Sequence, residues 1–287
     1  MRAWHHRVVS SIVERYDRDA AEYQRHWAPV LDSTARRLLD RAAPLVASPP
    51  AAPSILDVGT GSGVLAIAAT RRWPHAHVIA ADASAGMLDI ARGTAFRADI
   101  AADDPRLGWL HAPADALPIA DSAIDLVVSS FVYQLVPDRA VALHEALRVL
   151  RPHGHIALVT WLDSGEEFLP AVAFDEAVYD LAIDEPEEEP EEVRAGDFRS
   201  ARTAANELRR AGFVRVSARA EALEHAWTRE GYLTFKQRYD EVALFDFLDR
   251  RTARRLLDRA RERLADLPDA AFTWRADVVS VVAQRPG

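Results

Sequence analysis

The stretch that decides the fold of this chain is Ile55-Leu56-Asp57-Val58-Gly59-Thr60-Gly61-Ser62-Gly63. An apolar run leads into it and a helical pattern leads out of it, so the glycines lie where a strand turns into a helix. Glycine lets the backbone turn tightly there and lets a ligand approach the main chain closely. The nicotinamide and flavin fingerprint is Gly-x-Gly-x-x-Gly, whereas here the third glycine comes one residue early. Asp57, two residues before the first glycine, would discourage a pyrophosphate and suit a cationic amine.

A second acid follows at the end of the next apolar run. Asp82 comes after residues 77–81 and lies 21 residues beyond Gly61. An acid at about this distance from a glycine loop can accept hydrogen bonds from ribose hydroxyls. The loop and its two acids together indicate a nucleoside-containing ligand at the carboxyl edge of a parallel sheet.

The residues around this loop alternate between two patterns. Short apolar runs predict strands at 55–58, 77–81, 108–111, 126–129 and 155–160, and helical patterns predict helices at 63–72, 85–92 and 139–150. Strands that are nearly all apolar and alternate with helices are typical of a parallel sheet covered on both faces.

The flanking regions have different patterns. The first 50 residues read as helix and end at a pair of prolines. Residues 163–198 hold a dense acidic block from Asp184 to Glu192, for which we expect a solvated loop, with a flap over a site as the alternative. The remaining segments predict a helix at 201–211, a strand at 213–218, helical structure over 221–272 and a closing strand at 278–282.

Composition excludes several classes of protein. The chain of 287 residues carries 35 basic and 44 acidic residues, and a net charge of −9 argues against binding a phosphate backbone. The lack of cysteine removes disulfides, zinc–thiolate sites and thiol nucleophiles. No apolar run is long enough to span a bilayer, and the charged start does not resemble a signal peptide, so we expect a cytoplasmic protein. No metal-ligand spacing of histidine and glutamate is present, so we expect no metal site.

Four motifs in order now carry a family resemblance. The glycine loop, Asp82, residues 114–118 and residues 147–155 together resemble a class I S-adenosylmethionine-dependent methyltransferase of the menaquinone/ubiquinone-methyltransferase-like (type 11) group. The resemblance covers about residues 10–160, and residues 201–218 extend it. One departure is His153, where the family usually has glycine in the turn before the fifth strand.

The resemblance implies an α/β architecture. We expect a Rossmann-like, doubly wound, seven-stranded and mostly parallel sheet with N-terminal helices and a helical cap insert. The implied domains are an N-terminal helical lid over residues 1–50, a cofactor-binding domain over 51–220 and 273–287, and a helical insert over 221–272, with the acidic loop at 163–198.

The resemblance also implies S-adenosylmethionine as cofactor and assigns residues to it. The implied contacts are Asp57, Gly59, Thr60 and Gly61 at the methionine part, Asp82 at the ribose, Ala83 and Met87 near the adenine, Asp115 at the adenine amino group with Ala114 and Ala116 beside it, Ser130 near the methionine end, and Tyr23 as the lid tyrosine. Each of three residues has a structural alternative: Asp82 as a helix cap, Asp115 as part of a polar turn, and Met87 as a core residue.

The sequence gives less information about the methyl acceptor than about the cofactor. Methyl transfer is an in-line displacement that depends on alignment, and a base is needed only for a protonated, weakly acidic nucleophile. In this group the acceptor pocket is built from the N-terminal helix, the loop after the fourth strand and the helical insert. These segments contain Tyr16, Tyr23, Trp27, Phe131, Tyr133, Trp161, Tyr232, Phe235 and Tyr239, which suit a flat or apolar acceptor. The candidate catalytic residues are His26, His225 and Tyr133.

Three functions are compatible with the sequence. The first is methyl transfer to a small molecule, such as a secondary metabolite or a quinone-like compound. The second is a fold that binds the cofactor without methyl transfer, and the third is an NAD-type oxidoreductase, which the glycine spacing disfavours. The segment Ser129–Tyr133 lacks the Asn/Asp-Pro-Pro-aromatic arrangement of base-modifying amino-methyltransferases, so we expect no nucleic-acid partner. The sequence leaves a homodimer open.

Overall fold

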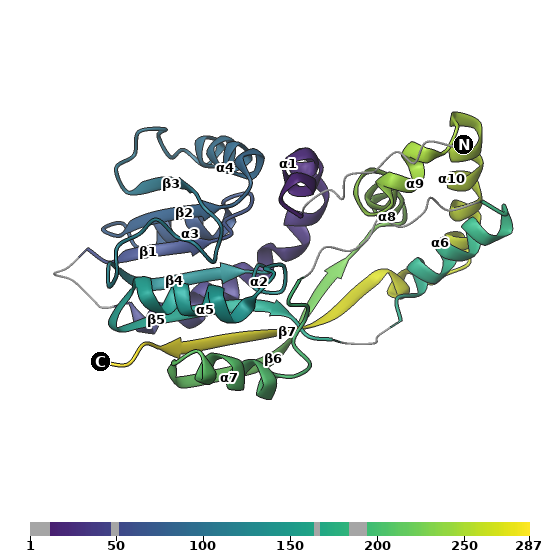
Figure 1. Ribbon diagram of the computed structural model, residues 1–287. Helices are drawn as coiled ribbons and strands as arrows, with labels where there is room; N and C mark the ends of the chain where they lie inside the picture. Colours follow the sequence, from purple (N-terminus) through teal and green to yellow (C-terminus); the bar gives the residue numbers. More distant parts are fainter. Residues whose placement is uncertain (1–11, 47–51, 164–166, 184–193) are drawn as a thin grey trace, which may run out of the picture.

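The centre of the molecule is a seven-stranded sheet (Figure 1). This computed structural model describes residues 12–46, 52–163, 167–183 and 194–287. The strands are β1 (Ser54–Val58), β2 (His77–Asp82), β3 (Leu107–His111), β4 (Ile124–Ser130), β5 (Leu150–Trp161), β6 (Val214–Ala226) and β7 (Thr273–Gln284). Their order is β3-β2-β1-β4-β5-β7-β6, with β1 to β5 parallel and β7 antiparallel to both of its neighbours. The expected doubly wound, mostly parallel sheet is confirmed.

Helices cover both faces of this sheet because its central strands are apolar on both sides. The covering helices are α2 (Ala28–Ala42), α3 (Val64–Arg72), α4 (Ala85–Arg97), α5 (Arg139–Val149) and α7 (Ala201–Arg210). Leu38 of α2 and Leu65 of α3 are buried on one face, and Leu143 of α5 and Leu208 of α7 on the other. The sheet therefore has two separate hydrophobic cores.

The N-terminal region is helical over its described residues. It consists of α1 (Ile12–Glu22), a π-helical turn η1 (Tyr23–Trp27), α2 and a short 3-10 turn η2 (Ala43–Leu45). In Figure 1, α1 lies beside α4, above the edge of the sheet where the parallel strands end. The expected proline pair that ends this region lies outside the described residues.

A separate group of helices, which we call the helical lobe, stands beside the sheet (Figure 1). It consists of α6 (Leu169–Asp180), α8 (Arg229–Phe235), a second π-helical turn η3 (Lys236–Asp240), α9 (Val242–Phe247), α10 (Arg250–Ala265) and the 3-10 turn η4 (Asp269–Phe272). Its own core includes Phe174, Leu233, Leu256 and Phe272. Beyond the last pair of β5 with β7, Trp161 and Val278, the strands β6 and β7 continue alone as a two-stranded ribbon that leads to the lobe.

Two expectations are wrong at this ribbon and lobe. Residues 221–226 form the end of β6 and not helix, because they pair in register with 273–278 of β7. The segment 163–198, expected as a loop, contains α6, whose apolar residues Phe174 and Val178 are buried in the lobe core. The helical lobe is therefore assembled from two pieces of chain on either side of α7. The acidic block 184–192 lies outside the described residues.

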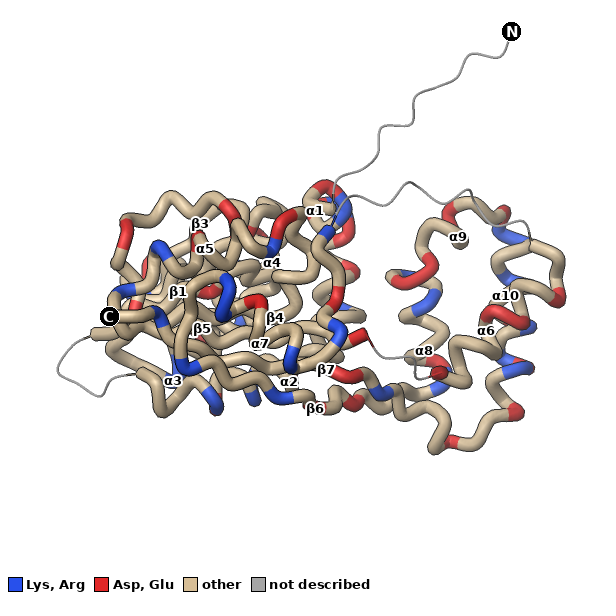
Figure 2. Tube along the Cα trace, turned by 60° about the horizontal axis from the view of Figure 1, so that its bottom comes forward, with Lys and Arg blue, Asp and Glu red and all other residues tan. Residues whose placement is uncertain are grey.

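Charged residues of both signs are interspersed over the sheet domain and the helical lobe (Figure 2). Within the lobe, Arg259 and Arg263 of α10 form ion pairs with Asp180 of α6. No helix in the described part of the chain is both long and apolar enough to cross a bilayer. The same residues contain no group of three or more His, Cys, Asp or Glu side chains placed to hold a metal ion.

Candidate functional site

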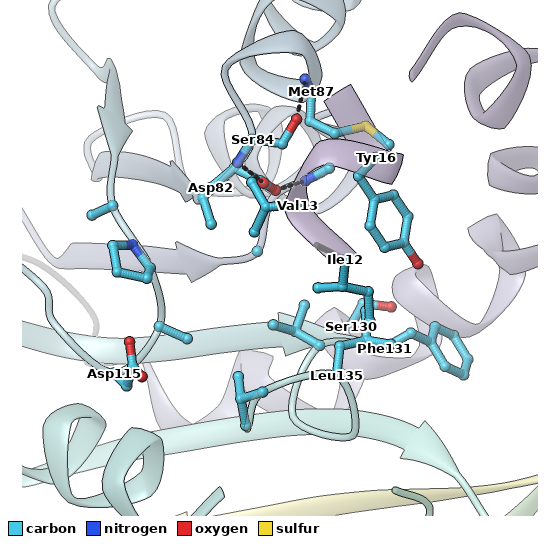
Figure 3. Close-up of a pocket in the computed structure, with 18 of the residues that line it drawn as sticks. Ile12, Val13, Tyr16, Asp82, Ser84, Met87, Asp115, Ser130, Phe131 and Leu135 are labelled. Carbon is cyan, nitrogen blue, oxygen red and sulfur yellow. Dashed lines mark hydrogen bonds between the residues drawn. The ribbon is translucent and has the colours of Figure 1, made fainter. Parts of the chain in front are cut away.

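An open cavity lies at the carboxyl ends of β1, β2 and β4 (Figure 3). It has about 1090 Å³ of empty space, part of which is open to solvent. Its walls come from α1, the glycine loop, the turn after β2, segment 112–115 and segment 130–137. A smaller cavity shares Tyr23, Gly59, Gly61 and Ser130 with it and also reaches Asp57. Both lie where open α/β sheets bind ligands, outside the carboxyl ends of the strands.

The glycine loop adopts a backbone that other residues rarely reach. Gly59, Gly61 and Gly63 have φ angles of 66°, 52° and 86°. A Cβ atom on Gly59 would lie 2.2 Å from Cγ2 of Val132, so only glycine lets the loop after β4 approach. A Cβ on Gly61 would meet nothing nearer than the Tyr23 ring at 4.0 Å. The main chain at Gly61 therefore faces open space that a ligand can fill.

Asp57 is fully buried beside this loop. Its Oδ2 accepts hydrogen bonds from the Thr60 hydroxyl at 2.7 Å and from the Ala66 N–H at 3.0 Å. Its Oδ1 has no hydrogen-bond partner among the described residues. Burial raises the pKa of Asp57 to about 7. A buried carboxylate oxygen without a partner is costly, and an ammonium group of a bound ligand would satisfy it.

Asp82 holds the glycine loop and the turn after β2 together. Its Oδ2 accepts from the Gly61 N–H at 2.7 Å and its Oδ1 from the Ser84 N–H at 2.9 Å (Figure 3). Burial raises the pKa of this carboxyl group as well. Each carboxylate oxygen has a second lone pair, so Asp82 can still accept hydrogen bonds from the hydroxyls of a ligand.

Asp17 supports the wall of the site, although it lines neither cavity, and the sequence did not reveal it. It lies on α1, and its Oδ1 accepts from the Ser84 hydroxyl and, at 2.8 Å, from the Gly86 N–H. Ser84 is the N-cap of α4, where its Oγ accepts from the Met87 N–H. Asp17 thus joins the N-terminal helix to the turn that carries Asp82. Its partners are 67 and 69 residues away, so no local pattern marks it.

Aromatic rings connect the cavity wall with the helical lobe. Tyr16 and Tyr23 line the cavity, with ring centroids 5.7 Å apart in an edge-to-face arrangement. Tyr239 of the lobe contacts Tyr23 in the same manner at 6.1 Å. Trp27 stacks on Phe235 of the lobe at 5.6 Å.

Comparison with known proteins shows which fold and which domain this chain resembles. Residues 56–158 match the family model described as a methyltransferase domain. The chain is 39% identical over 112 residues to a ubiquinone/menaquinone biosynthesis C-methyltransferase of Dinoroseobacter shibae, which covers 39% of this chain and 44% of that protein. Residues 56–158 of this chain are therefore similar to a methyltransferase domain, and the matched relatives share only part of the chain.

Other methyltransferases match over longer segments. A malonyl-[acyl-carrier protein] O-methyltransferase of Methylococcus capsulatus is 32% identical over 181 residues, 61% of this chain and 62% of that protein. The chain thus spans less than half the length of the Dinoroseobacter relative and less than two thirds of the Methylococcus one.

Solved structures share the fold of this chain at low sequence identity. A Haemonchus contortus phosphoethanolamine N-methyltransferase, in complex with phosphomonomethylethanolamine and S-adenosylhomocysteine, has a TM-score of 0.55 at 16% identity, covering 94% of this chain and 58% of that one. The [4+2]-cyclase SpnF has a TM-score of 0.54 at 16% identity, covering 96% of both chains.

Most residues that the sequence resemblance assigns to the cofactor lie together at the two cavities. The large cavity is lined by Tyr23, Gly59, Gly61, Asp82, Ala83, Met87, Ala114, Asp115 and Ser130. Asp57 and Thr60 line the smaller cavity. Ala116 is exposed and lines neither.

The candidate catalytic residues do not come together at the cavities. The His26 Nε2 lies 3.2 Å from a Glu22 carboxylate oxygen, and the His225 ring packs on Trp227 at 4.4 Å. Tyr133 is 1% exposed, its hydroxyl has no partner among the described residues, and burial raises its pKa. None of the three lines either cavity.

The helical insert also lies away from the cavity walls, contrary to expectation. No residue of 221–272 lines either cavity. Of the aromatic residues proposed for the acceptor pocket, only Tyr16, Tyr23 and Phe131 line the large one. The remaining aromatic residues pack in the hydrophobic cores or between the sheet and the helical lobe. The aromatic rings of the lobe contact η1 and do not line the cavity.

Proposed function

We propose that this protein transfers the methyl group of S-adenosylmethionine to a small-molecule acceptor. The observation that carries the proposal is the unpaired, buried Oδ1 of Asp57 beside the open face of Gly61. The site offers an acid for an ammonium group at one end and Asp82 for hydroxyls at the other. A nucleoside attached to an amino acid carries both groups.

Each part of the cofactor has a candidate partner on this chain. Asp57 accepts from the ammonium group and Asp82 from the ribose hydroxyls. Ala83 and Met87 pack against the adenine, and Asp115 accepts from its amino group. The bound cofactor supplies an electrophilic methyl carbon on a sulfonium, so the protein's work is to align an acceptor with that carbon and exclude water.

The remaining walls indicate the kind of acceptor. Ile12, Val13, Leu135 and Val136 line the large cavity without a role at the cofactor, and Phe131 adds an aromatic ring. No Lys, Arg or His side chain is among the described residues that line it. An apolar or flat acceptor, such as a secondary metabolite or a quinone-like compound, fits these walls. Its nucleophile would have to be reactive without a histidine or lysine base from the described walls.

The test combines binding with product analysis. Calorimetry with S-adenosylmethionine, S-adenosylhomocysteine and NADH should show binding of the first two and none of NADH. Incubation with methyl-labelled S-adenosylmethionine and cell extract, followed by mass spectrometry, should then reveal a labelled small molecule. Binding of NADH in preference to S-adenosylmethionine would instead support the oxidoreductase.

A second candidate function is cofactor binding without methyl transfer. The observation in its favour is that His26, His225 and Tyr133 all lie away from the cavities. In this case S-adenosylhomocysteine would bind, but no extract fraction would yield a labelled product.

A further inference from the structure

Two π-helical turns face each other between the cofactor site and the helical lobe. One is η1 of the N-terminal region and the other is η3 of the lobe. Trp27 of η1 stacks on Tyr239 of η3 with ring centroids 6.3 Å apart and planes at 18°. Single π-helical turns are rare and are frequently found at functional sites, so two of them in contact draw attention to this junction.

Tyr239 is also connected to the cofactor site, because its ring contacts Tyr23. The Tyr23 ring lines both cavities and lies over Gly61. It is held between Tyr16 at 5.7 Å and Tyr239 at 6.1 Å, both edge to face. Tyr23 therefore has one aromatic neighbour on its own helical segment and one on the lobe.

The π-helical turn that carries Tyr239 is fixed by the single lysine of the chain. The Lys236 side chain is 5% exposed, and its Nζ pairs with Asp240 at 2.7 Å and with Glu241 at 2.9 Å. The Glu241 N–H donates to the Lys236 carbonyl at 2.8 Å, which closes the turn. The ammonium group also lies 4.7 Å from the centre of the Phe174 ring in the lobe core. These contacts hold the backbone turn that carries Tyr239.

We propose that Tyr239 is a positioning residue of the cofactor site, through which the helical lobe fixes the Tyr23 ring over the glycine loop. The inference rests on the proposed cofactor. A ring held in place before binding loses less conformational freedom when the ligand arrives, so the lobe strengthens cofactor binding without touching the cofactor. The lobe then acts on the cofactor site although none of its residues lines the cavities.

Phe235 provides a matched control for Tyr239. It also belongs to the lobe, is 7% exposed and stacks on the same Trp27, at 5.6 Å. It has no ring contact with Tyr23 among those recorded for the described residues. Phe235 also packs on Tyr239, with ring centroids 5.9 Å apart. Loss of either ring removes lobe packing on Trp27, but only loss of Tyr239 removes the lobe ring that touches Tyr23.

The experiment compares Tyr239→Leu, Tyr239→Met, Tyr239→Phe and Phe235→Leu with the wild type. Calorimetry measures the Kd for S-adenosylhomocysteine, and thermal unfolding of each variant measures its stability. We expect Tyr239→Leu and Tyr239→Met to raise the Kd by roughly two- to tenfold, the factor that corresponds to one aromatic pair. Tyr239→Phe keeps the ring and should retain the wild-type Kd, and Phe235→Leu should lower Tm but leave the Kd unchanged.

Unchanged affinity in both ring-removing variants, or equal weakening by Phe235→Leu, would overturn the positioning role. Tyr239→Met fills much of the same space with a flexible side chain and decides the question if the leucine variant does not fold. A wild-type protein that does not bind S-adenosylhomocysteine would refute the proposed cofactor instead, which separates the two failures.

Discussion

Asp57 keeps a carboxyl group in the protein core, where the residues that the structure describes donate hydrogen bonds to only one of its two oxygens. This arrangement disfavours the charged form, and burial accordingly raises the pKa of the group to about 7. Under the proposed function, the ammonium group of the cofactor would satisfy the Asp57 oxygen that has no partner among the described residues. The charged carboxylate of Asp57 would therefore favour binding of the cofactor but lower the stability of the folded protein.

The destabilising effect of the charged Asp57 carboxylate should appear in the pH dependence of the free energy of unfolding. The pKa of Asp57 rises from about 4 in the unfolded chain to about 7 in the folded one, so the folded protein binds more protons between these values. The free energy of unfolding contributed by this group therefore falls as pH rises through this window, by up to about 4 kcal/mol. Asp57→Asn should abolish that fall, which urea unfolding across the pH range measures against the wild type. Parallel curves for the two proteins would contradict the assignment.

Asp82 has the more conventional role of a hydrogen-bond acceptor. Asp82→Ala should weaken S-adenosylmethionine binding by roughly 1–3 kcal/mol, the usual loss for charge-assisted hydrogen bonds. Asp89 is a matched control, since it is an exposed acid on the neighbouring helix and pairs with Arg92. Asp89→Ala should bind the cofactor like the wild type, and calorimetry compares all three. Unchanged affinity in Asp82→Ala would remove that residue from the site.

At the scale of elements, α1 is held to α4 by a few specific contacts. Gly86 permits the approach, because a Cβ there would lie 2.9 Å from the Asp17 carbonyl oxygen. The Asp17 side chain then accepts from Ser84 and Gly86 at the start of α4. These contacts keep Ile12, Val13 and Tyr16 of α1 at the cavity wall.

Removal of the Asp17 carboxylate should loosen α1 without unfolding the protein. Asp17→Ala should speed amide hydrogen exchange in residues 12–22 by roughly three- to tenfold, as expected for the loss of two hydrogen bonds on a half-exposed helix. Asp19→Ala is the control on the same helix, since Asp19 pairs with the exposed Arg18. Exchange measured by mass spectrometry should separate the two variants. Equal exchange in both would show that α1 is held by its apolar contacts alone.

At the scale of the whole molecule, Arg139 joins three segments that are distant in sequence. Its side chain is 6% exposed and donates to the Tyr133 carbonyl at 3.0 Å, to the Gly196 carbonyl and to Glu207 at 3.1 Å. Its guanidinium group also lies 3.9 Å from the centre of the Phe198 ring. The loop after β4 is thereby tied to α7 and to segment 194–198.

Arg139→Met should therefore destabilise the protein by about 2–4 kcal/mol, because two backbone carbonyls and a carboxylate lose their donor. Arg151→Met provides the comparison, since Arg151 forms an ion pair with Asp125 in which both side chains are substantially exposed. Its loss should cost less than about 1 kcal/mol. Urea unfolding measures both values, and a similar loss for the two variants would contradict the structural role of Arg139.

Some of the differences between sequence and structure follow from tertiary pairing. The strand at 213–218 continues to Ala226 because β7 provides a partner for each additional residue of β6. His153 has a φ angle of 65°, the backbone region that the family's usual glycine adopts without strain. The turn expected before the fifth strand is instead an irregularity inside β5, where the pairing with β4 shifts register between Leu150 and His155.

The sequence by itself determined the parallel sheet, the glycine loop and the two acids that flank it. These features lie within consecutive strand–turn–helix units, so their geometry follows from residues that are neighbours in the chain. Only the tertiary structure decided that Asp17 reaches Ser84, that α6 joins α8 and α10 in one lobe, and that His26, His225 and Tyr133 stay away from the cavities. Such contacts depend on how whole elements pack, because the residues involved are far apart in the chain and each alone has many compatible partners.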